Sequence, residues 1–284
     1  MYAQSITRAH RTAFILAIDQ SGSMAQRIRF GGIETTKAEA VAEVANRLLF
    51  ELIERARRSD GVRDYYDVAV LGYSGDGVVS LLGDPLPLVS VARLAELPVE
   101  RRVRLVERRM PDGSPAVRRI ETPAWIAPKA SGETPMYEAL LQIRDLVRGW
   151  CAHPAHRESF PPMIFNITDG EASDCEPREQ LDICNQIRAT GTADGQTLLL
   201  NIHTASDAEA RSLVFPADGE IDPANRYARL LHDCSSVMPD NLSEAIRQVR
   251  GDNALPPFRG MSHNASIAEL IAILNIGSIS IRIQ

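Results

Sequence analysis

Mainly apolar runs of strand length recur along the chain and are separated by longer, partly polar segments. These runs are residues 14–18, 67–73, 163–167 and 197–202. They are typical of strands buried on both faces, as in a parallel sheet. In the segments between them, apolar residues recur every three or four positions, which predicts amphipathic helices. The clearest cases are residues 36–58, 135–150 and 179–189. This alternation predicts an α/β fold with a doubly wound, mostly parallel central sheet and helices on both faces.

Shorter patterns predict the remaining elements. Residues 78–82 are expected to form one antiparallel edge strand, paired with the preceding strand through a turn at 74–77. Residues 27–35 are interpreted as a connection that contains glycine. The other expected elements are a helical turn at 89–94, helices at 222–232 and 240–249, and a small last strand at 234–238.

The segment from Asp84 to Pro128 differs in character from its surroundings and is interpreted as an insertion. Two alternating stretches, 103–110 and 116–122, flank the turn-forming residues 111–115, which predicts an inserted β-hairpin. Its charged residues are Arg101, Arg102, Arg104, Arg108, Arg109, Arg118 and Arg119, with Glu100, Glu107 and Glu121. Such a hairpin can be a solvated appendage or a docking surface for an acidic partner, and the sequence leaves both interpretations open.

We expect one large domain over residues 1–250, including the insertion at about 84–128, followed by a C-terminal extension over 251–284. The extension begins with a polar, proline-containing connector, continues as a short apolar helix to residue 274, and ends in an alternating stretch at 279–283. It can pack on the domain, or it can offer an edge strand to a partner.

Composition narrows the functional classes. A formal net charge of −6 argues against nucleic-acid binding as the main activity. No apolar run of about 18 residues and no hydrophobic signal core occur, so we expect a cytoplasmic protein without membrane contact. The four cysteines contain no Cys-x-x-Cys pair, which fits reduced thiols in that compartment.

The first apolar run ends at a candidate for metal chemistry. Asp19 follows directly, and the hydroxyls of Ser21 and Ser23 come after it at steps of two, with Gly22 allowing a tight turn. A strand of a parallel sheet delivers such a group to the crevice at its carboxyl end. One carboxylate and two hydroxyls are hard oxygen ligands, which suit Mg²⁺ or Mn²⁺ better than zinc.

Two later segments offer further oxygen ligands. Thr134 precedes a proline at the expected start of a helix, where its hydroxyl is predicted to be exposed. Asp169 ends the third apolar run and is followed by glycine, so it repeats the pattern of Asp19 and is expected to stand beside it if the two strands are neighbours. His203, at the end of the fourth run, is assigned no role.

Together these residues carry a family resemblance. Asp19-x-Ser21-x-Ser23, Thr134 in a Gly-x-Thr-Pro context, and Thr168-Asp169-Gly170 resemble the metal-ion-dependent adhesion site of von Willebrand factor type A domains. The resemblance spans roughly residues 12–250. In its insertion and composition the chain is more similar to bacterial intracellular members found with tellurium-resistance, kinase and phosphatase, or MoxR-type ATPase systems than to animal adhesion receptors.

The resemblance implies a Rossmann-like fold and a binding function without catalysis. It implies that Asp19, Ser21, Ser23, Thr134 and Asp169 hold Mg²⁺, with Mn²⁺ as an alternative, and that a protein partner completes the coordination with an Asp or Glu. We therefore expect a metal-dependent interaction module of a bacterial signalling, stress or defence system.

Three other interpretations stay open at this stage. Asp19 and Asp169 can simply cap backbone amides at the strand ends. The same site can serve an adaptor subunit of an AAA or MoxR-type ATPase, as in some relatives. A metal-dependent phosphohydrolase of the haloacid-dehalogenase type also places an aspartate there, but it needs Asp-x-Asp for proton transfer, and here the second position is Ser21.

Overall fold

The computed structural model describes residues 2–30, 33–83, 87–97, 100–109, 115–204 and 212–279. Its strands are β1 Thr12–Asp19, β2 Arg27–Phe30, β3 Ile33–Thr36, β4 Arg57–Arg58, β5 Gly61–Val62, β6 Tyr66–Ser74, β7 Gly77–Ser80, β8 Val89–Ser90, β9 Glu100–Arg109, β10 Pro115–Ala124, β11 Met163–Thr168, β12 Leu198–Thr204, β13 Leu213–Val214 and β14 Met261–Ala265. Its α-helices are α1 Lys37–Ala56, α2 Val91–Glu96, α3 Met136–Ala152, α4 Pro177–Arg188, α5 Arg226–Cys234, α6 Ser243–Arg250 and α7 Ile267–Ile279. Short 3₁₀ turns lie at Gly22–Ala25, Pro154–His156 and Asp240–Leu242.

An eight-stranded sheet forms the centre of the molecule, in the order β13-β14-β12-β11-β1-β6-β7, with β8 also pairing with β6. The five strands from β14 to β6 are parallel, whereas β7, β8 and β13 run antiparallel to their neighbours. The predicted α/β class and the antiparallel edge strand after β6 are therefore confirmed. A further antiparallel strand, β13, lies at the opposite edge.

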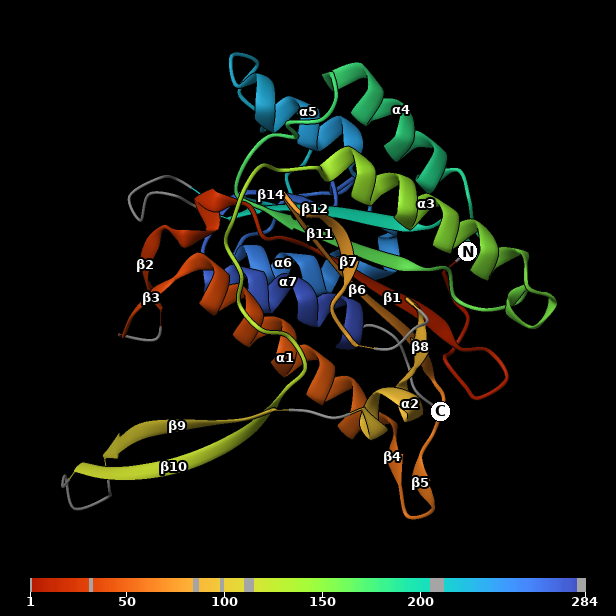
Figure 1. The fold of residues 1–284 in the computed structure, drawn as a ribbon. Coiled ribbons are helices and arrows are strands. Elements are labelled where there is room, and N and C mark those ends of the chain that lie inside the picture. Colours follow the sequence, from red (N-terminus) through yellow and green to blue (C-terminus); the bar gives the residue numbers. More distant parts are fainter. Residues whose placement is uncertain are drawn as a thin grey trace.

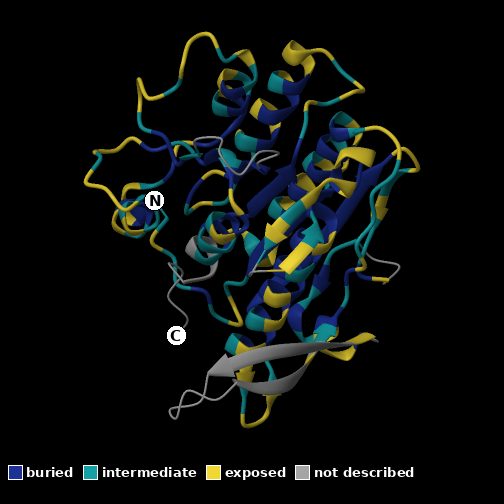
Figure 2. Ribbon diagram, turned by 90° about the vertical axis from the view of Figure 1, so that its left-hand side faces the viewer, coloured by how far each residue is buried: buried dark blue, intermediate teal, exposed yellow. Residues whose placement is uncertain are grey.

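Helices cover both faces of this sheet (Figure 1). Helices α3, α4 and α5 pack on one face, and α1, α2, α6 and α7 pack on the other. The central strands are dark blue in Figure 2 because every residue of β1, β6, β11 and β12 is buried. Double-sided burial explains why these strands appear in the sequence as continuous apolar runs rather than alternating ones.

Helix α1 is the longest helix among the described elements, and its start is encoded locally. Thr36 accepts a hydrogen bond from the Glu39 amide, and the Glu39 carboxylate accepts one from the Thr36 amide. This capping box satisfies amides that have no partner inside the helix. The predicted helix over 36–58 thus matches the observed one within about two residues at each end.

Two connecting segments differ from their expected form. Residues 27–30 and 33–36, in the segment expected as a connection that contains glycine, pair as a small hairpin of β2 with β3. Residues 234–238 are not a strand of the sheet; Val237 makes only an isolated bridge with Arg259. The strand expected there is supplied by β14, from the segment interpreted as a C-terminal extension. Because β14 is short and mixes polar with apolar residues, it lacks the continuous apolar run that marks the other parallel strands.

The C-terminal segment also supplies α7, whose apolar residues join the same core cluster as α1. The alternating stretch expected at 279–283 lies almost wholly outside the described residues. In the part of the chain that the structure describes, no helix combines the length and apolar character needed to cross a membrane.

The predicted inserted hairpin is confirmed as β9 and β10, which pair antiparallel from Arg109 and Pro115 to Glu100 and Ala124. In Figure 1 it extends away from the body of the molecule below α1. The turn at 110–114 and most of the predicted arginine side chains lie outside the described residues. Among the side chains that are described, Arg101 lies 3.5 Å from Glu121 across the hairpin.

One buried side chain fastens the returning end of this insertion to the body. Asn46 of α1 accepts hydrogen bonds from the amides of Trp125 and Ile126 and donates one to the Ile126 carbonyl. The side chain of Ile126 is buried in the core beside α1. A single amide group thus satisfies three backbone groups where the chain leaves β10 for the next segment.

We predict that Asn46→Ala lowers the free energy of unfolding by about 2–4 kcal/mol, because it leaves buried backbone groups without partners. Urea denaturation followed by circular dichroism measures this change. The neighbouring substitution Arg47→Ala removes a largely exposed side chain and is expected to change the free energy by less than about 1 kcal/mol. Equal effects of the two substitutions would contradict the anchoring role of Asn46.

Candidate metal centre

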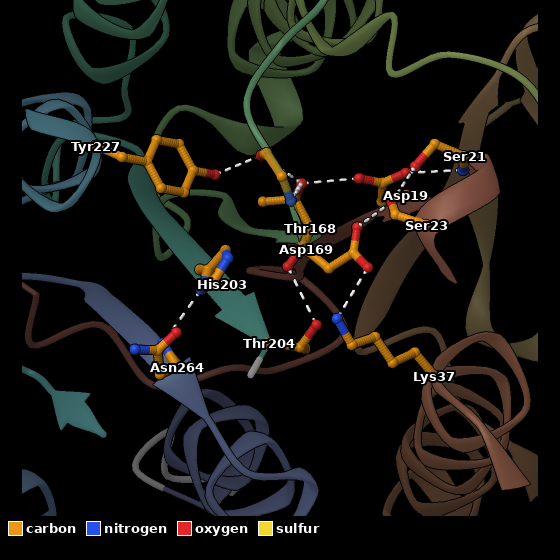
Figure 3. A network of polar contacts seen from close by, with 11 residues as sticks. Asp19, Ser21, Ser23, Lys37, Thr168, Asp169, His203, Thr204, Tyr227 and Asn264 are labelled. Carbon is orange, nitrogen blue, oxygen red and sulfur yellow. Dashed lines mark hydrogen bonds and ion pairs between the residues drawn. The ribbon is translucent and has the colours of Figure 1, made fainter. Parts of the chain in front are cut away.

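The pairing of β1 with β11 brings the two predicted carboxylates together. These strands are parallel neighbours, with Ile18 opposite Ile167, so Asp19 and Asp169 follow at the same edge of the sheet. The Asp19 residue is fully buried, and only 1% of the Asp169 side chain is exposed. Figure 3 shows both carboxylates in one network of polar contacts.

Both carboxylate oxygens of Asp19 accept hydrogen bonds from uncharged groups. Its Oδ1 accepts the Ser21 amide at 2.8 Å, and its Oδ2 accepts the Thr168 hydroxyl at 2.8 Å. Burial raises the pKa of the Asp19 carboxyl, although the hydrogen bonds from Ser21 and Thr168 oppose this shift. A carboxylate held in this way is positioned and dehydrated before any ligand arrives.

The two serines connect this group to Asp169. The hydroxyls of Ser21 and Ser23 lie 3.0 Å apart, and the Ser23 hydroxyl donates to Asp169 Oδ1 at 2.6 Å. Ser21 is buried, whereas Ser23 is exposed. The hydroxyls therefore stand between the carboxylates and solvent.

The loop of Thr134 packs directly against the serine loop. The Gly22 amide donates to the Gly132 carbonyl at 2.9 Å, and the Ser131 amide donates to the Gln20 carbonyl at 2.8 Å. The structure thus places Thr134 in the segment that borders the site. Among the described contacts, however, its hydroxyl makes no hydrogen bond with the other four predicted ligands.

The segment after Asp169 fixes the start of α3. The Thr134 amide donates to the Ser173 hydroxyl, and the Asp174 carboxylate accepts the amides of Tyr137 and Glu138. Asp174 therefore satisfies free amides at the start of a helix to which it does not belong. The threonine loop and the aspartate loop are held together by these bonds.

Sequence analysis missed one charged member of the network. The Lys37 ammonium lies 3.0 Å from Asp169 Oδ2, and its side chain is completely buried. The hairpin of β2 and β3 leads the chain to this point, since the Lys37 amide donates to the Gln26 carbonyl. Lys37 is unusual in the sequence, because Lys37 and Lys129 are the only lysines in a chain rich in arginine. Nothing in the sequence, however, predicts the burial of Lys37.

A second group lies beside the network and contains no predicted ligand. The ring of His203 stacks on that of His263 at 4.7 Å, and Tyr227 packs edge-on against His203 at 5.4 Å. The Tyr227 hydroxyl donates to the Gly170 carbonyl. Burial lowers the pKa of His203 to about 4, aided by the neighbouring His263 and Lys37, so this imidazole is neutral near pH 7. Its ring nitrogen Nδ1 accepts the Asn264 amide at 3.2 Å, a contact that holds β14 beside β12.

Comparison with known proteins gave matches only among solved structures. No family model and no curated protein matches the chain. Solved structures similar to it include a von Willebrand factor type A protein from Catenulispora acidiphila, at 14% identity and a TM-score of 0.39 over 70% of this chain and 34% of that one. The von Willebrand factor domain of the type V pili tip protein Mfa5 from Porphyromonas gingivalis matches at 14% identity and 0.34, over 60% and 40% of the two chains.

A third match is an uncharacterized membrane-spanning protein from Vibrio fischeri, at 14% identity and a TM-score of 0.28, covering 69% of this chain and 71% of the other. The present chain thus spans well under half the length of the first two structures. The first two of these structures are von Willebrand factor domains, and all three are similar to this chain only at low identity.

The chemistry of the donor set can be judged from the described residues alone. Two carboxylates and two hydroxyls meet in one hydrogen-bonded group, and all their donor atoms are oxygens. No cluster of three or more His, Cys, Asp or Glu side chains suited to a metal occurs in the described ranges. Hard oxygen ligands of this kind fit Mg²⁺ or Mn²⁺ and do not fit zinc.

We predict that Gly132→Ala lowers the free energy of unfolding by about 1–3 kcal/mol. Gly132 has a φ of +71°, and an added Cβ would lie 2.5 Å from the Gly75 Cα, so either the backbone strains or the threonine loop moves. Chemical denaturation measures the change. The control is Gly149→Ala in α3, where an added Cβ meets nothing within 4 Å and helix propensity should raise stability by about 0.5–1 kcal/mol. Two changes of the same sign would contradict this account of the loop.

The lowered pKa of His203 predicts a pH dependence of stability. The unfolded chain takes up a proton near the ordinary pKa of 6.5, but folded His203 does so only near 4. Stability is therefore lost as the pH falls from 6.5 towards 4, by up to about 1.4 kcal/mol per pH unit from this one residue. His203→Asn keeps an acceptor for the Asn264 amide and should show a shallower slope in denaturation experiments over this range. An unchanged slope would show that His203 is not the group responsible.

Proposed function

We propose that this chain is a metal-dependent protein interaction module, in which a divalent cation at the carboxyl end of β1 and β11 recognises an acidic residue of a partner protein. The observation that supports this most directly is the contact network of Asp19, Ser21, Ser23 and Asp169. Four oxygen-bearing side chains from two separate strand ends converge there. Capping of backbone amides alone needs only the Ser21 amide contact to Asp19 and does not explain the convergence of the other three.

Each residue has a distinct part in this proposal. Ser21, Ser23 and Thr134 would supply hydroxyl oxygens, and Asp19 and Asp169 would hold the ion directly or through water. A bound Mg²⁺ or Mn²⁺ supplies an open coordination position for an oxygen ligand. Thr168 holds Asp19 in place through Oδ2, and Ser23 orients Asp169 through Oδ1.

Access to the site supports recognition of a large partner. Ser23, Gly132 and Glu133 are exposed, while the carboxylates beneath them are buried. A carboxylate on the surface of another protein can therefore approach from the side of the hydroxyls without entering a deep pocket. This arrangement suits docking of a side chain.

The contacts favour binding over hydrolysis. In a phosphohydrolase of the haloacid-dehalogenase type, Asp19 would be the nucleophile and the residue at position 21 the acid and base. Ser21 cannot transfer protons near neutral pH, and both oxygens of Asp19 are already hydrogen-bonded. We therefore propose no catalytic role. The chain could use the same site as an adaptor of an AAA or MoxR-type ATPase, or in a kinase and phosphatase system. These alternatives differ only in the partner protein.

We predict that Asp19→Asn raises the dissociation constant for Mg²⁺ or Mn²⁺ at least about tenfold, because it removes the charge of one metal ligand. The fold should persist, since a neutral side chain suits this buried position and the Thr168 hydroxyl can accept as well as donate. Isothermal titration calorimetry measures the affinity, and circular dichroism checks the fold. Asp76→Asn is the matched control, because that carboxylate is exposed and pairs with Lys129. Equal affinity of wild type and Asp19→Asn would refute the metal site.

Partner recognition is tested by affinity capture from a bacterial lysate with Mg²⁺, with EDTA, and with Asp19→Asn in Mg²⁺, followed by mass spectrometry. We expect a partner that is retained only by the wild-type chain with Mg²⁺. The same partners in all three arms would move recognition to another surface and leave the site without a binding role.

A further inference from the structure

Lys37 carries a buried charge at the start of a helix. It is the first residue of α1, where the helix dipole repels a positive charge. Its side chain is 0% exposed, so its ammonium has lost hydration that close polar or anionic groups must replace. An apolar residue at this position would avoid both costs but would leave the buried Asp169 carboxylate without its counter-ion. The placement therefore ties the charge of Lys37 to Asp169.

The charge acts on the candidate metal site. Lys37 Nζ lies 3.0 Å from Asp169 Oδ2, while Asp169 Oδ1 accepts the Ser23 hydroxyl. The same carboxylate thus faces the ligand group with one oxygen and the ammonium with the other, as Figure 3 shows. Asp169 is shared between an internal cation and the expected position of an external one.

The described network joins three ionic side chains, and their formal charges can be summed. Asp19 and Asp169 contribute −2 and Lys37 contributes +1, so the sum is −1. A divalent cation changes this sum to +1, and the carboxylate of a partner returns it to zero. Without Lys37 the corresponding sums are −2, zero and −1. The lysine therefore opposes entry of the metal ion and favours entry of the carboxylate.

We propose that Lys37 is a built-in counter-cation of the metal site, which weakens binding of the divalent cation alone and strengthens binding of the acidic residue to the loaded site. This inference rests on the function proposed above and specifies how that site is tuned. Lysine suits the role because its charge is concentrated at one small ammonium on a flexible stem, unlike the planar guanidinium of arginine. Its use here is notable in a chain that otherwise carries its positive charges almost entirely on arginine.

Two substitutions separate the charge from the other properties of Lys37. Lys37→Met removes the charge and keeps the length of the side chain, and Lys37→Gln removes the charge but keeps a hydrogen-bond donor. The control is Lys129→Met, which removes the only other lysine, at a partly exposed position. Variants of the 284-residue chain are compared by calorimetric titration with Mn²⁺ and with Mg²⁺, and by thermal unfolding with and without metal.

We predict that both Lys37 variants bind Mn²⁺ at least about tenfold more tightly than wild type, because removal of one nearby like charge favours the cation. Without metal they should unfold at a lower temperature than wild type, because Asp169 has lost its counter-ion, and metal should raise their unfolding temperature more than that of wild type. Lys129→Met should match wild type in every measurement. Acetate, as a simple carboxylate probe, should bind the metal-loaded Lys37 variants more weakly than loaded wild type.

The outcomes distinguish this inference from the proposed function. If wild type binds metal and Asp19→Asn does not, but both Lys37 variants bind with unchanged or lower affinity, the counter-cation is refuted and the metal site stands. If the Lys37 variants bind metal and wild type does not, the lysine excludes the ion, which supports its opposing role and refutes the proposed function. If no protein binds metal, both proposals are wrong. If Lys37→Met does not fold, the metal affinity of Lys37→Gln and its acetate titration decide whether Lys37 is a counter-cation.

Discussion

The organisation of this structure depends on two carboxylates that end neighbouring parallel strands. The register of β1 and β11 places Asp19 and Asp169 side by side, and burial prevents water from separating their charges. Such a pair is stable only where donors or cations compensate it. That compensation comes from the serine loop, Thr168 and Lys37.

Much of this arrangement could be predicted from residue patterns. The parallel strands can be predicted because strands buried on both faces are mainly apolar. Asp19 and Asp169 can be predicted as site residues because each ends such a run. The hairpin of β9 and β10 followed from alternation around a proline and glycine turn. The ligand assignment of all five residues stays a prediction. Four of them meet in one network, whereas the Thr134 loop borders the site and its hydroxyl contacts none of the other four in the described network.

Other features could not be predicted, for physical reasons. The burial of Lys37 depends on the direction in which the hairpin of β2 and β3 returns the chain, and a lysine after a helix cap ordinarily lies in solvent. β14 contains serine, histidine and asparagine, and it forms a strand because it pairs parallel with β12 and antiparallel with β13. In both cases tertiary contacts overrule the local preference of the residues.

The position of β14 and α7 has a consequence for synthesis of the chain. The apolar face of α1 shares its core with Ile267, Leu270 and Leu274 of α7, which follows much later in the sequence. The ribosome therefore releases α1 more than two hundred residues before the helix that covers it. During this interval the nascent chain exposes an amphipathic helix and an unpaired edge of β12, the kinds of surface that chaperones bind. Folding of the central sheet can be completed only when β14 has emerged.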